Sequence, residues 1–168
     1  LVLREQHRYD EALGYLERAR ALWQRALGAA HQKTLMARTS MAVVHERAGD
    51  LAGAQRAFEE ILALRTASDE SRAATLTSLG AVLGKQGRHA EALARHKEAL
   101  LLRRASAQHR STSLSAVGVE LLALGRAREA LAPLQEALAL EGAGEGAAQA
   151  QARAALAQVL WGRERERA

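Results

Sequence analysis

The chain has 168 residues and a net charge of +5, and 48% of its residues are hydrophobic although only 3% are aromatic. Alanine and leucine, both strong helix formers, supply most of the apolar residues, so the composition favours an all-α protein. The absence of cysteine excludes a disulfide framework and a thiolate metal site. No apolar run approaches the roughly 18 residues that span a bilayer, and the N-terminus lacks a signal-peptide core. We therefore expect a cytoplasmic protein with no membrane partner.

The N-terminal segment already has the composition of a helix from Leu1 to Gln6, and it begins without an initiator methionine. We therefore expect the sequence to be part of a longer protein. The following residues, from Tyr9 through Trp23, continue as a long helix in which Trp23 is expected to join the core.

Three glycines, Gly49, Gly87 and Gly125, are evenly spaced along the chain, and we call the distance from each to the next the repeat interval. Upstream of each glycine, at the same distance, an apolar residue is followed by a small one: Met41-Ala42, Leu79-Gly80 and Val117-Gly118. Downstream of each glycine, an alanine also occurs at the same distance. A period between about 20 and 50 residues is typical of stacked supersecondary units that bury their apolar faces against their neighbours. The spacing therefore predicts a repeat protein.

Each copy is expected to contain two helices. Apolar or small residues recur at i, i+3, i+4 and i+7 up to each glycine, as at Leu76, Leu79, Gly80 and Leu83. The glycine suits the left-handed residue that ends the first helix. Ser68, followed by two acids, is predicted to cap the first helix of one copy.

The paired helices are expected to approach closely. Small residues lie on the facing sides of the two helices, with Ala42, Gly80 and Gly118 in the first helices and Ala54, Ala92 and Ala130 in the second. Bulky replacements at these positions should clash. Pro133 lies about two turns into a second helix and should bend that helix slightly without ending it.

These residues resemble the tetratricopeptide repeat (TPR), a helix-turn-helix unit with small interhelical residues and a turn glycine. Tyr9 to Leu13 match the start of a second helix, and His7 takes the turn-glycine position. The stretch from His7 to Gly49 is slightly longer than the repeat interval and is similar to the long repeat of kinesin light chain-type proteins. The resemblance implies an all-α, right-handed TPR superhelix of about three full and two partial hairpins in a single domain. Its expected boundaries are 1–33 (partial, with a long second helix), 34–68, 69–106, 107–144 and 145–168 (partial).

TPR proteins usually bind an extended peptide or a partner helix on the concave side, which the first helices line. The resemblance therefore implies a groove lined by Met36, Thr39, Ser40, Val43, Arg47, Thr77, Ser78, Ala81, Lys85, Ser115, Val119, Leu122, Gln158 and Trp161. Its hydroxyls could bond a peptide backbone, and Arg47 and Lys85 could take an acidic side chain. The alternative is that these serines and threonines are neutral residues on an unused face.

Several patterns only superficially suggest catalysis or metal binding. Gly80 to Gln86 differs from a phosphate-binding loop in its spacing and is predicted to be helical, and Gly142 to Gly146 follows a helix instead of a strand. We interpret the latter as a loop between repeats. His45 and His96 take positions where the repeat wants an apolar residue, which indicates packing and not a metal site. We expect no catalytic residue, metal or cofactor.

The sequence thus predicts a non-catalytic scaffold for a protein or peptide partner. Its richness in arginine and alanine resembles the repeat tails of large bacterial signalling proteins, which implies that another domain of the same chain could be the partner. One alternative is a sensor of small ligands or signalling peptides that changes the superhelix pitch. A weaker alternative is nucleic-acid binding, because the basic residues alternate with acids instead of forming one basic face. We also expect end-to-end self-association through the apolar faces of the terminal helices, for example at Leu13 and Leu16.

Overall fold

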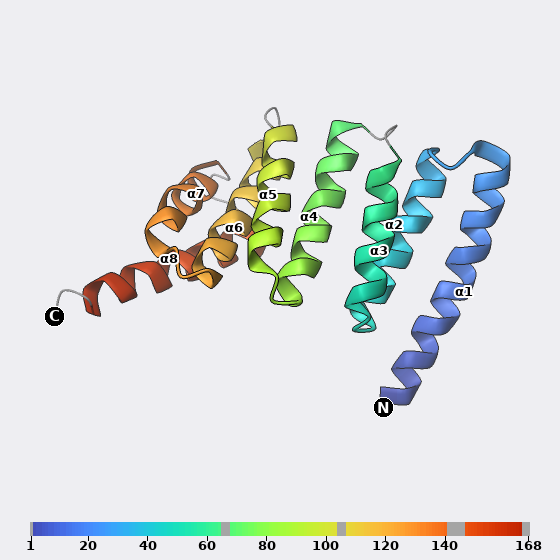
Figure 1. Cartoon of the computed structure of the whole chain (residues 1–168), viewed down its shortest axis with the longest axis horizontal. Coiled ribbons are helices and arrows are strands. Elements are labelled where there is room, and N and C mark those ends of the chain that lie inside the picture. Colours follow the sequence, from blue (N-terminus) through green and yellow to red (C-terminus); the bar gives the residue numbers. More distant parts are fainter. Residues whose placement is uncertain (1, 65–67, 104–106, 141–146, 166–168) are drawn as a thin grey trace.

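The computed structural model describes residues 2–64, 68–103, 107–140 and 147–165. Every element in these ranges is a helix: α1 (Val2–Leu27), α2 (Gln32–Arg47), α3 (Leu51–Ala63), α4 (Asp69–Lys85), α5 (His89–Leu102), α6 (Ala107–Ala123), α7 (Ala127–Leu140) and α8 (Ala147–Arg165). The helices follow one another in a row from α1 at one end to α8 at the other (Figure 1). The predicted all-α solenoid is confirmed. Among the described residues, none of the helices combines the length and the apolar character that crossing a bilayer needs.

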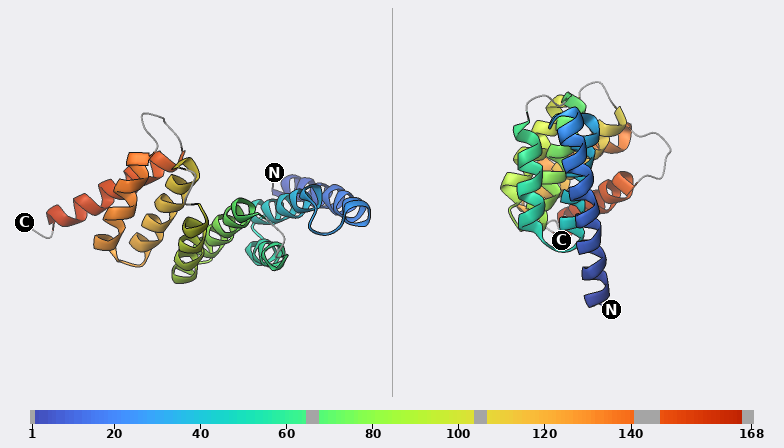
Figure 2. Two further views of the ribbon diagram at one scale, coloured as in Figure 1. Left: turned by 90° about the horizontal axis from the view of Figure 1, so that it is seen from above. Right: turned by 90° about the vertical axis from the view of Figure 1, so that its right-hand side faces the viewer.

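Each helix packs against the next one in the chain, so α2–α3, α4–α5 and α6–α7 form three hairpins between α1 and α8. Among the described helices, α4 also packs on α6 and α6 on α8, whereas successive second helices make no comparable contact. In a curved stack of hairpins, the helices on the inner side come closer to their counterparts in the next hairpin than the helices on the outer side do. The first helices α2, α4, α6 and α8 therefore form the inner layer of the superhelix, which Figure 2 shows from above and end-on.

The first partial hairpin differs from the prediction. α1 runs without a break from Val2 to Leu27, so the turn expected at His7 is not formed and no first-helix remnant separates from it. The turns at Gly49, Gly87 and Gly125 all place their glycine at positive φ, from 72° to 83°. A histidine in that conformation would be strained, while continuing the helix through His7 costs nothing. The spacing matches a turn position, but a histidine there would cost about 1–2 kcal/mol more than a glycine in the left-handed conformation.

The three predicted turn glycines are confirmed as left-handed residues that directly follow the first helices. At the middle turn α4 ends at Lys85, and the N–H of Arg88 donates to the carbonyl of Leu83 at 2.9 Å, which satisfies a carbonyl at the helix end. The predicted cap of α4 is also confirmed, because Ser68 Oγ accepts a hydrogen bond from the N–H of Ser71 at 3.3 Å.

Asp50 caps α3 and provides a test of this local structure. Its carboxylate accepts from the N–H of Gly53 at 2.8 Å and lies 2.9 Å from Nδ1 of His45. The bond from Gly53 lowers the pKa of Asp50, as does the neighbouring His45. We expect Asp50→Ala to lower the free energy of unfolding by about 1 kcal/mol, because the cap is lost. Asp50→Asn keeps an acceptor and should lose less, and a urea titration of both variants at neutral pH checks the order; equal losses would contradict it.

The close helix crossings are confirmed, although the partners of the small residues differ from those expected. A Cβ built on Gly80 would come within 2.5 Å of the His96 ring, and one on Gly118 would overlap the Leu134 side chain in the same way. His96 and Leu134 are buried, as is Phe58 at the corresponding position of the first hairpin. A small residue in the first helix thus faces a large one in the second. α7 continues through Pro133, as predicted.

The two terminal helices expose apolar side chains. Tyr15 and Leu22 on α1 and Leu160 and Trp161 on α8 are large hydrophobic residues with exposed side chains. Leu13 and Leu16, which were expected to be uncovered, are half-buried, as is Trp23. The expected end-to-end association stays a prediction.

Candidate functional site

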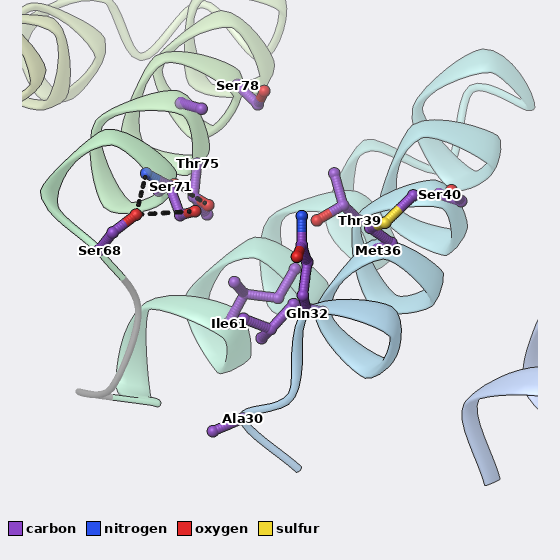
Figure 3. A pocket seen from close by; sticks show the side chains of 12 residues that line it. Ala30, Gln32, Met36, Thr39, Ser40, Ile61, Ser68, Ser71, Thr75 and Ser78 are labelled. Carbon is purple, nitrogen blue, oxygen red and sulfur yellow. Dashed lines mark hydrogen bonds between the residues drawn. The ribbon is translucent and has the colours of Figure 1, made fainter. Parts of the chain in front are cut away.

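The inner layer opens into a pocket of about 610 Å³ between α2 and α4 (Figure 3). Unlike α6 and α8, these two first helices make no extensive contact among the described residues. Side chains of the N-terminal halves of both helices line the pocket, together with the end of α3: Ala30, Gln32, Leu35, Met36, Thr39, Ser40, Ile61, Ser68, Ser71, Ala74, Thr75 and Ser78. All of them are uncharged. Such a pocket can offer hydrogen bonds and apolar contact without an electrostatic preference.

The structure brings four of the predicted groove residues, Met36, Thr39, Ser40 and Ser78, together around this pocket. Met36 is 60% exposed, so its apolar side chain is accessible to a ligand in the pocket. Thr75 Oγ1 donates to the carbonyl of Ser71 at 2.9 Å, but the hydroxyls of Thr39, Ser40 and Ser78 make no hydrogen bond to other described residues. These three hydroxyls are free to bond a ligand.

The remaining predicted residues lie away from the pocket. Ser115 is only 1% exposed, so the prediction that it lines the surface of the groove is wrong. Its helix, α6, packs against α5, α7 and α8. Val119 and Leu122 pack against the core, Val43 packs against the core of the first two hairpins, and Ala81 is exposed outside the pocket. Gln158 and Trp161 are exposed on α8.

The two predicted basic points are not equivalent. Lys85 Nζ lies 2.7 Å from the Glu46 carboxylate of the preceding hairpin, so its charge is already paired. Arg47 is exposed and makes no ion pair with the described residues. Neither residue lines the pocket. Of the two predicted basic points, only Arg47 is thus without an ion pair among the described residues.

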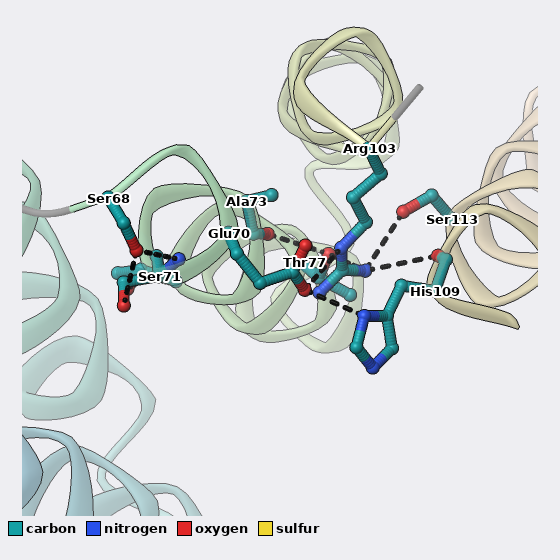
Figure 4. A network of polar contacts seen from close by, with 9 residues as sticks. Ser68, Glu70, Ser71, Ala73, Thr77, Arg103, His109 and Ser113 are labelled. Carbon is teal, nitrogen blue, oxygen red and sulfur yellow. Dashed lines mark hydrogen bonds and ion pairs between the residues drawn. The ribbon is translucent and has the colours of Figure 1, made fainter. Parts of the chain in front are cut away.

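Thr77 belongs to a different polar cluster, at the junction of α4 and α6 (Figure 4). Arg103, which is 6% exposed, extends from the end of α5 into this junction. Its Nη1 donates to Thr77 Oγ1 at 3.2 Å, to Ser113 Oγ at 3.1 Å and to the His109 carbonyl at 3.3 Å. Its Nε lies 3.5 Å from the Glu70 carboxylate, which also contacts His109 Nδ1 at 2.8 Å. The guanidinium thus fills this junction, which we call the Arg103 cage.

Most of the residues that line the pocket are not among those predicted from the sequence. Gln32, Ser71 and Thr75 lie in the first two turns of α2 and α4, outside the residues that were expected to line the groove. Ile61 is a buried core residue of α3 that also forms part of the pocket wall. The polar stretch around Ser68 was the signal that could have located this rim.

The patterns that superficially suggested other chemistry are resolved where the structure describes them. Gly80 to Gln86 lies in α4 and its C-cap, and not in a phosphate-binding loop. Gly142 to Gly146 lies outside the described residues. His96 is buried against Gly80, while His45 is half-buried beside Asp50. In the part of the chain that the structure describes, no three His, Asp or Glu side chains converge as metal ligands would.

Hairpins stacked in one dimension, with a positive-φ glycine at each turn and a small residue at each crossing, define a helical-repeat protein of the solenoid class. The sequence profile of the tetratricopeptide repeat family matches residues 1–67 and 71–141. The chain therefore belongs to the tetratricopeptide repeat family, whose members are in general scaffolds for protein–protein interaction.

Solved structures are similar to the chain along most of its length. Two of them show the nearly identical TPR-like repeats of a Podosopora anserina protein described as a kinesin light chain, one as a substituted variant. Their TM-scores are 0.77 and 0.76 at 20% identity, and the match covers 99% of this chain and 85% of each of theirs. BtubC (BKLC) from P. vanneervenii has a TM-score of 0.72 at 18% identity, over 83% of this chain and 61% of its own. The expected kinesin light chain-like fold is confirmed. No curated protein matches the chain in sequence.

Proposed function

We propose that this chain is a docking module that holds an extended segment of a partner protein in the pocket between α2 and α4. The observation that carries the proposal is that the described residues leave this junction of the inner layer open, while Arg103 fills the next one. Exposed Met36 offers apolar contact there. The hydroxyls of Ser40 and Ser78 can bond the backbone of an extended segment, whose N–H and C=O groups need partners once they leave water.

The pocket can be blocked by a single substitution with a matched control. Ala74 is an exposed alanine of α4 that lines the pocket, and Ala94 is an exposed alanine of α5 that does not. We expect Ala74→Trp to fill the pocket and weaken binding by at least about tenfold, whereas Ala94→Trp leaves binding unchanged. Capped nonapeptides selected from a random library on the wild-type protein, and measured by fluorescence polarisation, provide the probe. Equal binding by both variants would overturn the proposal.

We further propose that the module is part of a bacterial signalling or regulatory protein, where it docks a partner or another domain of the same chain. The arginine- and alanine-rich composition supports this assignment. A small ligand is the second candidate for the same pocket, because about 610 Å³ lies in the range of small-molecule sites. A ligand that bridges α2 and α4 would fix the angle between the α2–α3 and α4–α5 hairpins. Binding would thereby change the pitch of the superhelix, as a sensor requires.

A further inference from the structure

The open pocket and the Arg103 cage are the same structural position in successive repeats. Four residues that line the pocket each have a counterpart one repeat interval later in the sequence. These four counterparts surround the Arg103 guanidinium. The pairs are Gln32 and Glu70, Thr39 and Thr77, Ser71 and His109, and Thr75 and Ser113. The chain therefore contains, in its own fold, an occupied example of the pocket.

The occupied example shows what the position binds. At the Arg103 cage a long side chain enters between two first helices and places a planar, multi-donor group on two hydroxyls and a backbone carbonyl. The Glu70 carboxylate, 3.5 Å from Nε, supplies the counter-charge that a nearly buried guanidinium requires. The space between the two helices and the hydrogen-bond acceptors around it thus favour a planar donor group, and the Glu70 carboxylate favours one that is positively charged.

The pocket between α2 and α4 has hydroxyl acceptors like those of the Arg103 cage, but among its described lining residues it has no counterpart of the Glu70 carboxylate. Thr39 and Thr75 retain their hydroxyls, but Gln32 stands where the cage has Glu70, and none of the described residues that line the pocket is charged. An arginine would therefore lose solvation without gaining an ion pair. A carboxamide is the neutral planar group that both donates and accepts hydrogen bonds, and Leu35, Met36 and Ile61 offer an apolar wall for its stem.

From this correspondence we infer that the pocket between α2 and α4 takes a glutamine side chain from the partner segment. The inference rests on the proposed function and specifies the residue that anchors the partner. The glutamine stem lies along Met36 and Ile61, and its carboxamide bonds Thr39 and the side chain of Gln32. The recognised segment is uncharged at this position, in contrast to the acidic partner that Arg47 and Lys85 had suggested.

The test uses the full chain and the capped nonapeptides that Ala74→Trp no longer binds. Each peptide position is replaced in turn by Gln, Glu, Arg and Leu. One position should prefer Gln over Glu by about tenfold and over Arg and Leu by about threefold, since a neutral hydrogen bond is worth a factor of about 2 to 12 in affinity. The affinity should change little between about 50 and 300 mM salt, because no ion pair forms.

A designed reversal makes the test specific to the correspondence. Gln32→Glu restores the carboxylate that Glu70 provides in the cage, at the first residue of α2 where an acid suits the helix. This variant should prefer Arg at the same peptide position by about tenfold and should become sensitive to salt. The control Thr39→Val removes one hydroxyl and should weaken Gln peptides by about threefold without creating a preference for Arg.

The outcomes separate this inference from the proposed function. Pocket-dependent peptides that prefer Glu or Arg on the wild-type protein, or no shift toward Arg in Gln32→Glu, would overturn the glutamine assignment and leave the docking module intact. Peptides that bind Ala74→Trp normally would overturn both. The assays are repeated with Arg65→Ala, because Arg65 precedes Arg103 by one repeat interval and lies outside the described residues. The same preference is expected, and glutamine binding that appears only after this substitution would overturn the inference.

Discussion

Gly118→Ala is expected to lower the free energy of unfolding by about 1–3 kcal/mol, although alanine is the better helix former by about 1 kcal/mol. The reason is the crossing of α6 and α7, where the added Cβ would lie 2.5 Å from Leu134 Cγ and closer still to Cδ2. Leu134 is fully buried, so it cannot move into solvent to relieve the contact. Gly118→Leu should cost more than Gly118→Ala. Urea unfolding monitored by circular dichroism measures both.

Gly14 provides the matched control for this prediction. It is also a helical glycine, in α1, but a Cβ added there meets no other atom within 4 Å. Gly14→Ala should therefore stabilise the protein by about 0.5–1 kcal/mol, because only the helix propensity changes. In a double-mutant cycle, Leu134→Ala should remove the penalty of Gly118→Ala, since it removes the atoms that clash. A stabilising Gly118→Ala would contradict the close crossing.

Acidification from about pH 7 to pH 4 is expected to cost about 3 kcal/mol of stability through His96 alone. His96 is 2% exposed, and burial lowers its pKa from 6.5 to about 4. Its Nδ1 has no hydrogen-bond partner among the described residues. The unfolded chain takes up the proton below about pH 6.5 and the folded chain only below about pH 4, so the folded state loses stability throughout this interval.

His96→Leu is the control that isolates this effect. Leucine already fills the corresponding position at Leu134, where it faces Gly118 as His96 faces Gly80. The variant should be more stable than the wild type by about 1–2 kcal/mol at pH 7, because a buried unpaired nitrogen is removed. The difference in stability between variant and wild type should grow as the pH falls toward 4. A constant difference across this range would show that His96 takes up its proton equally well in both states.

The architecture could be predicted because it depends on local, repeated features. Gly49, Gly87 and Gly125 recur at even spacing, and each forms its left-handed turn within a few residues. The cap at Ser68 likewise depends only on the residues next to it. The expected turn at His7 is not formed, because histidine disfavours the left-handed conformation that glycine adopts at the other turns. Repeats that agree in sequence do not all agree in backbone.

The site could be predicted only in part, because it depends on how successive hairpins meet. Thr39, Thr77 and Ser115 occupy the same repeat position, yet one lines a pocket, one bonds Arg103 and one is buried. Their different surroundings come from contacts between helices that lie a whole repeat interval apart in the sequence. Likewise, Lys85 could not be recognised as paired until Glu46 was placed beside it.

The most direct test of the docking account is photo-cross-linking with a selected nonapeptide that carries a diazirine group. After irradiation of its complex with the full chain, mass spectrometry locates the attached residues. We expect cross-links to Met36 on α2 and to residues around Ser78 on α4, which face each other across the pocket. Cross-links confined to the outer helices α3, α5 and α7 would contradict the account.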